Sequence, residues 1–153
     1  MVRPRRDTLT TDLFRDYQPE PVVERFEAAQ VQAWSLKGRL SKAVALTLDE
    51  CALARDDIAK AMSEILKATV SKAMLDGYAS QARVEHSISA ERLAALVEVT
   101  GDTRALNVLL EHSGLIVVPQ KYEALLRREK ARELRERAER EEQAADAEWK
   151  ARR

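Results

Sequence analysis

Apolar residues recur at spacings of three and four over most of the first 110 residues, which is the pattern of amphipathic helices. The pattern predicts an amphipathic helix over residues 21–34, whose apolar stripe continues to about residue 50 with Gly38 either interrupting or weakening it, and further helices over 54–67, 71–83, 89–100 and 103–113. Residues 115–118 are too few for a helix and rich in β-branched side chains. We expect them to form an extended segment or a lone edge strand before Pro119. The predicted fold class is all-α.

The helix predicted over 54–67 has the clearest apolar face in the chain. That face comprises Ile58, Ala59, Met62, Ile65 and Leu66. Asp56 and Asp57 in its first turn suit the positive end of the helix dipole. For the helix over 21–34 the expected apolar stripe is Val22, Val23, Phe26, Ala29, Ala33 and Trp34, and for the last helix it is Leu106, Leu109 and Leu110. We expect 54–67 to lie in the core.

The stretch TVSKAMLDGYASQAR, residues 69–83, has helical spacing but only one apolar side. At 100° per residue, Val70, Met74, Leu75 and Tyr78 converge on that side. The opposite side collects Thr69, Lys72, Ala73, Asp76, Ala79, Ser80 and Arg83. Ser71 is placed to accept a hydrogen bond from a free amide at the start of this helix. The second side is polar and carries mostly short side chains.

A polar helix face of this kind, braced by a preceding helix, is typical of a helix-turn-helix over about 54–83 that reads the major groove of DNA. The candidate DNA-binding residues are Thr69, Ser71, Lys72, Ala73, Asp76, Ser80, Gln81 and Arg83. Asp76 is the awkward member, because a carboxylate repels phosphates unless it accepts a hydrogen bond from cytosine. The alternative is an ordinary core helix whose polar face is solvated.

From Tyr122 onward the chain contains no Gly or Pro and alternates acidic and basic residues at helical spacing. Such a segment predicts one long helix of roughly 45 Å. Ala131, Leu134, Ala138 and Ala145 form a thin heptad seam, and because its d positions include Arg127 and Glu141 it makes a poor two-stranded coiled coil in isolation. This helix is expected either to stand alone in solvent or to oligomerise, and its arginines could also contact phosphates. The predicted organisation is a flexible arm over 1–20, a helical DNA-binding domain over 21–119 and this charged extension over 120–153.

The amino-acid composition limits the kinds of function that the chain can perform. The chain has 26 basic and 26 acidic residues, so no overall positive charge indicates nucleic-acid binding. Cys51, the only cysteine, cannot form an internal disulfide and is predicted to be a buried thiol, which fits a reducing cytoplasm. His86 and His112 lack metal-site spacing, and there is no Gly-rich phosphate loop, nucleophile elbow or long apolar run. We expect no catalysis, no cofactor, no metal, no small-molecule substrate, and neither export nor membrane spanning.

Residues 35–119 resemble the CII-type lysogeny regulators of temperate and Mu-like phages. The resemblance lies in ARDDIAKAMSEIL, in the VSKAML that follows it, and in VTGDTRALNVLLEHSG leading into LIVVP. It implies a five-helix domain of the λ-repressor type that binds operator DNA as an oligomer in the bacterial host cell. By position, 57–66 would match the first helix of the motif and 71–80 the reading helix, with Lys72, Asp76 and Ser80 facing the groove.

One segment departs from that family. The usual short link containing glycine is replaced by SEILKAT, residues 63–69, which has no glycine, so we expect the first helix to run an extra turn. The resulting hypothesis is a non-enzymatic, double-stranded DNA-binding regulator of phage or prophage transcription, with an oligomeric assembly. The alternative is a protein-interaction adaptor in phage transposition or replication that docks a partner through the C-terminal helix. A weaker third hypothesis is a small structural coiled-coil protein.

Overall fold

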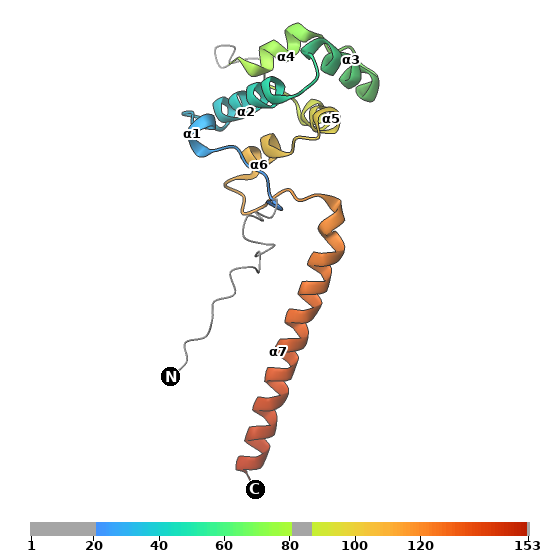
Figure 1. Ribbon diagram of the computed structural model, residues 1–153. Coiled ribbons are helices and arrows are strands. Elements are labelled where there is room, and N and C mark those ends of the chain that lie inside the picture. Colours follow the sequence, from blue (N-terminus) through green and yellow to red (C-terminus); the bar gives the residue numbers. More distant parts are fainter. Residues whose placement is uncertain (1–20, 81–86, 153) are drawn as a thin grey trace, which may run out of the picture.

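The computed structural model describes residues 21–80 and 87–152, and over these residues every regular element is helical (Figure 1). The elements are α1 (Ala28–Val31), α2 (Leu36–Glu50), α3 (Arg55–Leu66), α4 (Lys72–Ala79), α5 (Ala90–Thr100), α6 (Arg104–Leu110), the 3-10 turn η1 (Gln120–Tyr122) and α7 (Glu123–Ala151). The arm predicted over 1–20 lies outside the described residues, as do Gln81, Arg83 and His86. The all-α prediction is confirmed for the described chain.

Serine side chains begin three of the helices. Ser35 accepts a hydrogen bond from the amide of Gly38 at 3.1 Å, and Ser71 and Ser89 make the same bond to the amide three residues further on. Each bond satisfies one of the amides that a helix leaves without an internal partner at its start. At the other end of α5, Gly101 takes a positive φ of 71°, a conformation that glycine adopts without strain. The predicted cap Ser71 is confirmed.

The core lies where α2 packs against α1, α4 and α6, and where α3 packs against α4 and α5. Its completely buried large side chains are Val44, Thr47, Ile58, Met62, Leu75 and Leu96. They come from α2, α3, α4 and α5, so four short helices share one core. Figure 1 shows α1–α6 gathered into one body, from which α7 runs away as a single long helix.

The predicted helix over 21–34 is wrong. Only Ala28–Val31 is helical, and residues 21–26 form no helix. The carbonyl of Glu24 accepts a hydrogen bond from the side chain of Asn107 in α6 at 2.9 Å, which holds this segment against α6. Phe26 and Val31 are nevertheless buried, whereas Trp34, assigned to the apolar stripe, is fully exposed. Contacts with a distant helix override the local periodicity here.

Three further side chains differ from the predicted burial. Ile65 and Leu109 were assigned to apolar faces but are 40% and 38% exposed, because each lies at the edge of its helix's buried stripe. Cys51 follows the last residue of α2 and is half-buried against the core rather than enclosed. Leu53, two residues further along the chain, is exposed.

Asn107 also explains the segment that follows α6. The segment over residues 115–118 forms no strand, as expected for the extended alternative, and the amide of Val117 donates to the Asn107 side chain at 2.8 Å. One buried amide thus binds both the chain entering the body at Glu24 and the chain leaving it at Val117. α7 then begins after η1 and has no buried residue. None of the described helices has both the length and the apolar character needed to cross a membrane.

Candidate nucleic-acid interface

One side of α4 anchors this helix to the body. Leu75, Gly77 and Tyr78 are buried, and Met74 is partly buried against the same core. α4 contacts α2 as well as α3, so it is braced by two helices rather than by α3 alone. Ala79, predicted on the polar side, is partly buried against the core because it lies one helical turn beyond Leu75. The prediction for Ala79 is wrong.

The other side of α4 and the residues before it face solvent. The exposed members of the predicted set are Thr69, Ser71, Lys72, Ala73 and Asp76. Ser80 follows the last residue of α4 and is half-buried, while Gln81 and Arg83 lie outside the described residues. We call the five exposed residues the outer face of α4. Thr69 and Ser71 lie just before α4, and Lys72, Ala73 and Asp76 lie in its first two turns.

The turn between α3 and α4 is shaped without glycine. SEIL of the SEILKAT segment completes α3, and Lys67 then takes a left-handed conformation with a φ of 51°. The amide of Val70 donates to Ser63 Oγ at 2.8 Å, and Ser63 Oγ lies 2.7 Å from the carbonyl oxygen of Ala59. The side chain of Ser63 therefore ties the end of the turn back to α3. This contact sets where α4 starts relative to α3.

Asp76 on the outer face of α4 forms an ion pair with Arg55. The guanidinium of Arg55 lies between two carboxylates, 2.5 Å from Asp76 Oδ1 in α4 and 2.5 Å from Asp49 Oδ1 in α2. Hydrogen bonds to Asp76 first, and then to Asp49, raise the pKa of Arg55 despite its partial burial. Asp76 is thus an ion-pair partner that joins α4 to the start of α3. A cation at a helix N-terminus, where the dipole disfavours it, was the one sequence signal for this contact.

We expect Arg55 and Asp76 to be energetically coupled. In a double-mutant cycle of Arg55→Ala, Asp76→Ala and the double variant, the coupling free energy should be about 0.5–1 kcal/mol at low salt. It should shrink in high salt, because both side chains are partly exposed and the attraction is screened. Urea denaturation followed by circular dichroism measures it. Strictly additive effects of the two substitutions would remove the role assigned to this ion pair.

A second contact fixes the far end of α4. Arg92 of α5 donates a hydrogen bond to the hydroxyl of Tyr78, and its guanidinium carbon lies 5.7 Å from the centroid of the Tyr78 ring. The buried Tyr78 ring therefore has a polar partner at its tip and a cation over its face. Together with the contact of Arg55 to Asp76, it ties the second half of this helix of 8 residues to α3 and α5.

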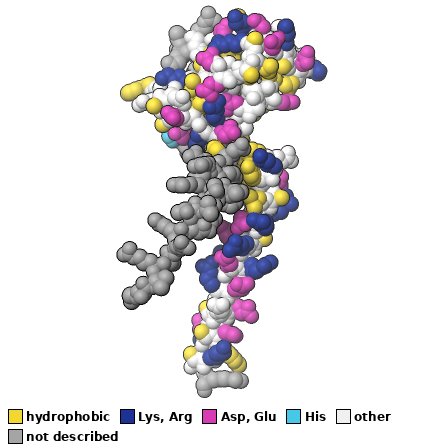
Figure 2. All heavy atoms as spheres, in the orientation of Figure 1, with side chains coloured by type: hydrophobic (Ala, Val, Ile, Leu, Met, Phe, Trp, Pro, Cys, Tyr) yellow, Lys and Arg dark blue, Asp and Glu magenta, His cyan; other side chains and the backbone are white. Residues whose placement is uncertain are grey.

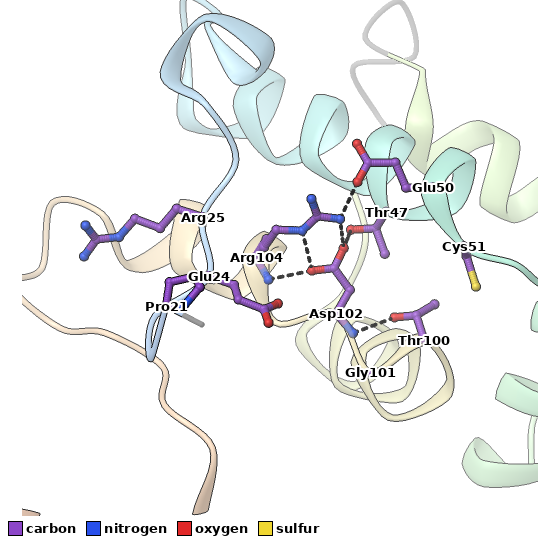
Figure 3. A pocket seen from close by; sticks show the side chains of 10 residues that line it. All are labelled: Pro21, Glu24, Arg25, Thr47, Glu50, Cys51, Thr100, Gly101, Asp102 and Arg104. Atoms are coloured by element: carbon purple, nitrogen blue, oxygen red, sulfur yellow. Dashed lines mark hydrogen bonds and ion pairs between the residues drawn. The ribbon is translucent and has the colours of Figure 1, made fainter. Parts of the chain in front are cut away.

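A separate polar cluster lies where α2 meets the start of α6 (Figure 3). Arg104 donates to Asp102 from its backbone amide, Nε and Nη2, at 2.8–2.9 Å, and its Nη2 also lies 2.6 Å from Glu50. Thr47 donates to Asp102 at 3.0 Å. The Arg104 guanidinium carbon stands 4.1 Å from the centre of the Phe26 ring. Figure 3 shows Arg104 between Asp102 and Glu50, beside a pocket of about 480 Å³.

The only cation of the cluster, Arg104, is held by two carboxylates of the same cluster, which argues for a structural role. Burial alone would raise the pKa of Asp102, but hydrogen bonds from Arg104 and Thr47 outweigh it and hold this pKa below its ordinary value. The same bond to Asp102 raises the pKa of Arg104. Asp102 accepts from the amide of Arg104, the first residue of α6, while Thr103 occupies the N-cap position and makes no side-chain cap bond. Arg104 at the start of α6 binds Asp102 and also Glu50 in α2, so the cluster joins α2 to α6.

Within the ranges 21–80 and 87–152, no three His, Cys, Asp or Glu side chains are grouped so as to hold a metal ion. Comparisons of the chain with protein-family models, with curated proteins and with solved structures find no match. What the outer face of α4 offers chemically is one ammonium group, two hydroxyls, a small apolar side chain and a carboxylate already paired with Arg55. These groups can bind a partner through hydrogen bonds, charge and van der Waals contact.

Proposed function

We propose that the protein is a sequence-specific, double-stranded DNA-binding regulator of phage or prophage transcription. In this proposal α3 and α4 act as a helix-turn-helix of the λ-repressor type, and α4 enters the major groove. The observation that carries it is the division of α4 between a side buried on α2 and α3 and an outer face that is exposed and polar. The protein acts without catalysis, by occupying its operator.

The residues of the outer face have separate roles in this proposal. Lys72, in the first turn of α4, contacts a phosphate or a guanine edge. Ser71 uses its oxygen to cap the helix, and its hydroxyl hydrogen donates to a phosphate. The hydroxyl of Thr69 also donates to a phosphate. Ala73 is small enough to let the helix approach and to meet a thymine methyl group.

Asp76 is compatible with this role because of its partner. Arg55, which Asp76 shares with Asp49, offsets part of its charge at 2.5 Å, so the carboxylate repels a nearby phosphate less than an isolated one would. The pair also orients Asp76 towards the start of α3. Asp76 therefore helps position α4, and only its remaining acceptor capacity is left for a cytosine amino group.

The test is a titration of full-length protein against the duplex upstream of its own coding sequence and an unrelated duplex, at two salt concentrations. Lys72→Ala should weaken binding about five- to tenfold and reduce the slope of log affinity against log salt by about one. The matched control is Lys150→Ala, which removes another exposed lysine, from the far end of α7. That variant should bind as the wild type does.

Two results would contradict the proposal. One is no preference for the upstream duplex at low salt and micromolar protein. The other is an equal loss of affinity in Lys72→Ala and Lys150→Ala, which would mean that overall charge, not the outer face of α4, binds DNA. Either result favours the adaptor alternative, which the full exposure of α7 supports as a surface for docking a partner protein.

A further inference from the structure

α7 presents a helical surface that the other described residues leave uncovered. It spans 29 residues and none of them is buried. Figure 2 shows basic and acidic side chains alternating along its length, away from the body. Leu134, in the middle of this helix, is 61% exposed. The pattern of these exposed side chains indicates what covers them.

Small side chains form a line along α7. Ala124, Ala131, Ala138 and Ala145 recur every seventh residue, a spacing that returns to nearly the same side of a helix. Next to this line on one side lie Arg127, Leu134, Glu141 and Glu148, and on the other side Arg128, Arg135, Glu142 and Trp149. Alanines at seven-residue spacing let two helix backbones approach closely over several turns. The two flanking rows would then border the contact.

Charge is distributed unequally between the two halves of α7. Residues 127–137 hold six basic and three acidic residues, a net charge of +3. Residues 139–148 hold one basic and five acidic residues, a net charge of −4. Ala138 lies between the halves. A helix with this polarity complements a copy of itself that runs in the opposite direction.

We propose that α7 pairs antiparallel with α7 of a second copy of this chain, about a two-fold axis at Ala138. Each flanking row then meets the same row of the other copy in reverse. Ala131 faces Ala145 of the second copy, Arg127 faces Glu148, and Arg135 faces Glu142. By symmetry each ion pair occurs twice. Arg135, Glu142 and Glu148 have no ion pair within the described chain, so these charges gain partners in the dimer.

A parallel pair would have the opposite electrostatics. Only the alanine line would face its own equivalent, and each flanking row would face the other row at the same height, which places Arg127 against Arg128 and Glu142 against Glu141. Like charges facing each other along a helix contact are destabilising, and they determine pairing direction. The alanine line alone permits both directions, so the charges select the antiparallel one.

Association is tested by sedimentation equilibrium of the full-length protein, whose monomer mass is 17.3 kDa, up to about 100 μM. Wild type should reach twice the monomer mass. Ala138→Arg should weaken the dimer at least about tenfold, because an arginine enters the closest contact. The matched control Ala147→Arg lies on the opposite side of α7 and should leave the dissociation constant within about twofold. A monomer throughout would overturn the proposal.

Direction is tested by cysteine crosslinking in a Cys51→Ser background, which removes the only native thiol. Ala138→Cys should form a disulfide-linked dimer, because Ala138 faces itself at the axis. Ala131→Cys alone should not, since the two thiols would stand about 21 Å apart. Mixing Ala131→Cys with Ala145→Cys should restore crosslinking. Self-crosslinking of Ala131→Cys would identify a parallel pair and overturn the proposal.

Neither measurement uses DNA. Failure of the dimer therefore leaves the proposed regulator standing, and failure of DNA binding leaves the dimer standing. Capture of an unrelated protein by α7 with no self-association at about 100 μM would also overturn the proposal, in favour of a hetero-partner.

Discussion

Leu75→Ala should lower the free energy of unfolding by about 3 kcal/mol. Leu75 is completely buried on the inner side of α4, where α4 packs against α2 and α3. Removing its side chain loses transfer free energy and leaves a cavity that four short helices cannot close without moving. The loss should be measured by urea denaturation and by thermal melting. Leu75 holds α4 in place but is not part of its outer face. DNA binding should therefore fall only under conditions in which the body begins to unfold.

The matched control for this substitution is Leu126→Ala on α7, where the leucine is 56% exposed and away from the alanine line. It should change stability by less than about 0.5 kcal/mol. A loss of under about 1 kcal/mol in Leu75→Ala would mean that α4 is not held by this core. The proposed reading helix would then have no rigid support.

Asp102→Asn should destabilise the protein by about 2 kcal/mol at neutral pH. The substitution keeps the shape of the side chain but removes the charge that binds Arg104 through three hydrogen bonds. It also leaves the half-buried Arg104 with Glu50 as its one remaining carboxylate in this cluster. The junction between α2 and α6 should weaken, and urea denaturation measures the change.

The same substitution carries a pH signature. The pKa of Asp102 is lowered in the folded protein, so its carboxylate stabilises the fold above the unfolded value of about 3.9. That stabilisation is lost as the pH falls through about 4 towards the lower folded value. The difference between wild type and Asp102→Asn should therefore be largest at neutral pH and shrink below about pH 4. Denaturation curves collected from pH 7 to pH 3 test this.

Glu133→Gln on the exposed surface of α7 is the control for charge removal. It should change stability by less than about 0.5 kcal/mol at every pH. A difference between wild type and Asp102→Asn that stayed constant down to pH 3 would show that the carboxylate's charge does not stabilise the junction.

Helices that depend on local signals were predictable from the sequence. α3 and α5 combine an apolar face with caps or acidic first turns, so their periodicity and their boundaries agree. The start of α4 at Ser71 follows from the same physics, because the capping hydroxyl and the amide it binds are three residues apart. The long helix after Tyr122 was predictable from the absence of Gly and Pro and from its charge spacing.

Long-range contacts account for what the sequence could not reveal. Asn107 binds a carbonyl 83 residues earlier, which no local pattern at 21–34 reports. Arg55 pairs with Asp76 across 21 residues and changes Asp76 from an isolated carboxylate into a positioning residue. The periodicity of 69–83 placed Ala79 on the wrong side, because its packing depends on which helices cover α4. The outer face itself was largely predictable, since exposed positions follow from the buried ones.

The exposure of α7 has a consequence for how this molecule unfolds. Within one chain the helix is stabilised by its own backbone bonds and by pairs such as Arg132–Glu136 and Arg137–Glu141, each worth only a few tenths of a kcal/mol. Its helix–coil transition is therefore gradual on heating, whereas the helices of the body lose their shared core together. By the lengths of the described helices, about a third of the ellipticity change belongs to α7 and about two thirds to the body. The melting curve of this chain is consequently the sum of a gradual loss of ellipticity from α7 and a cooperative transition from the body.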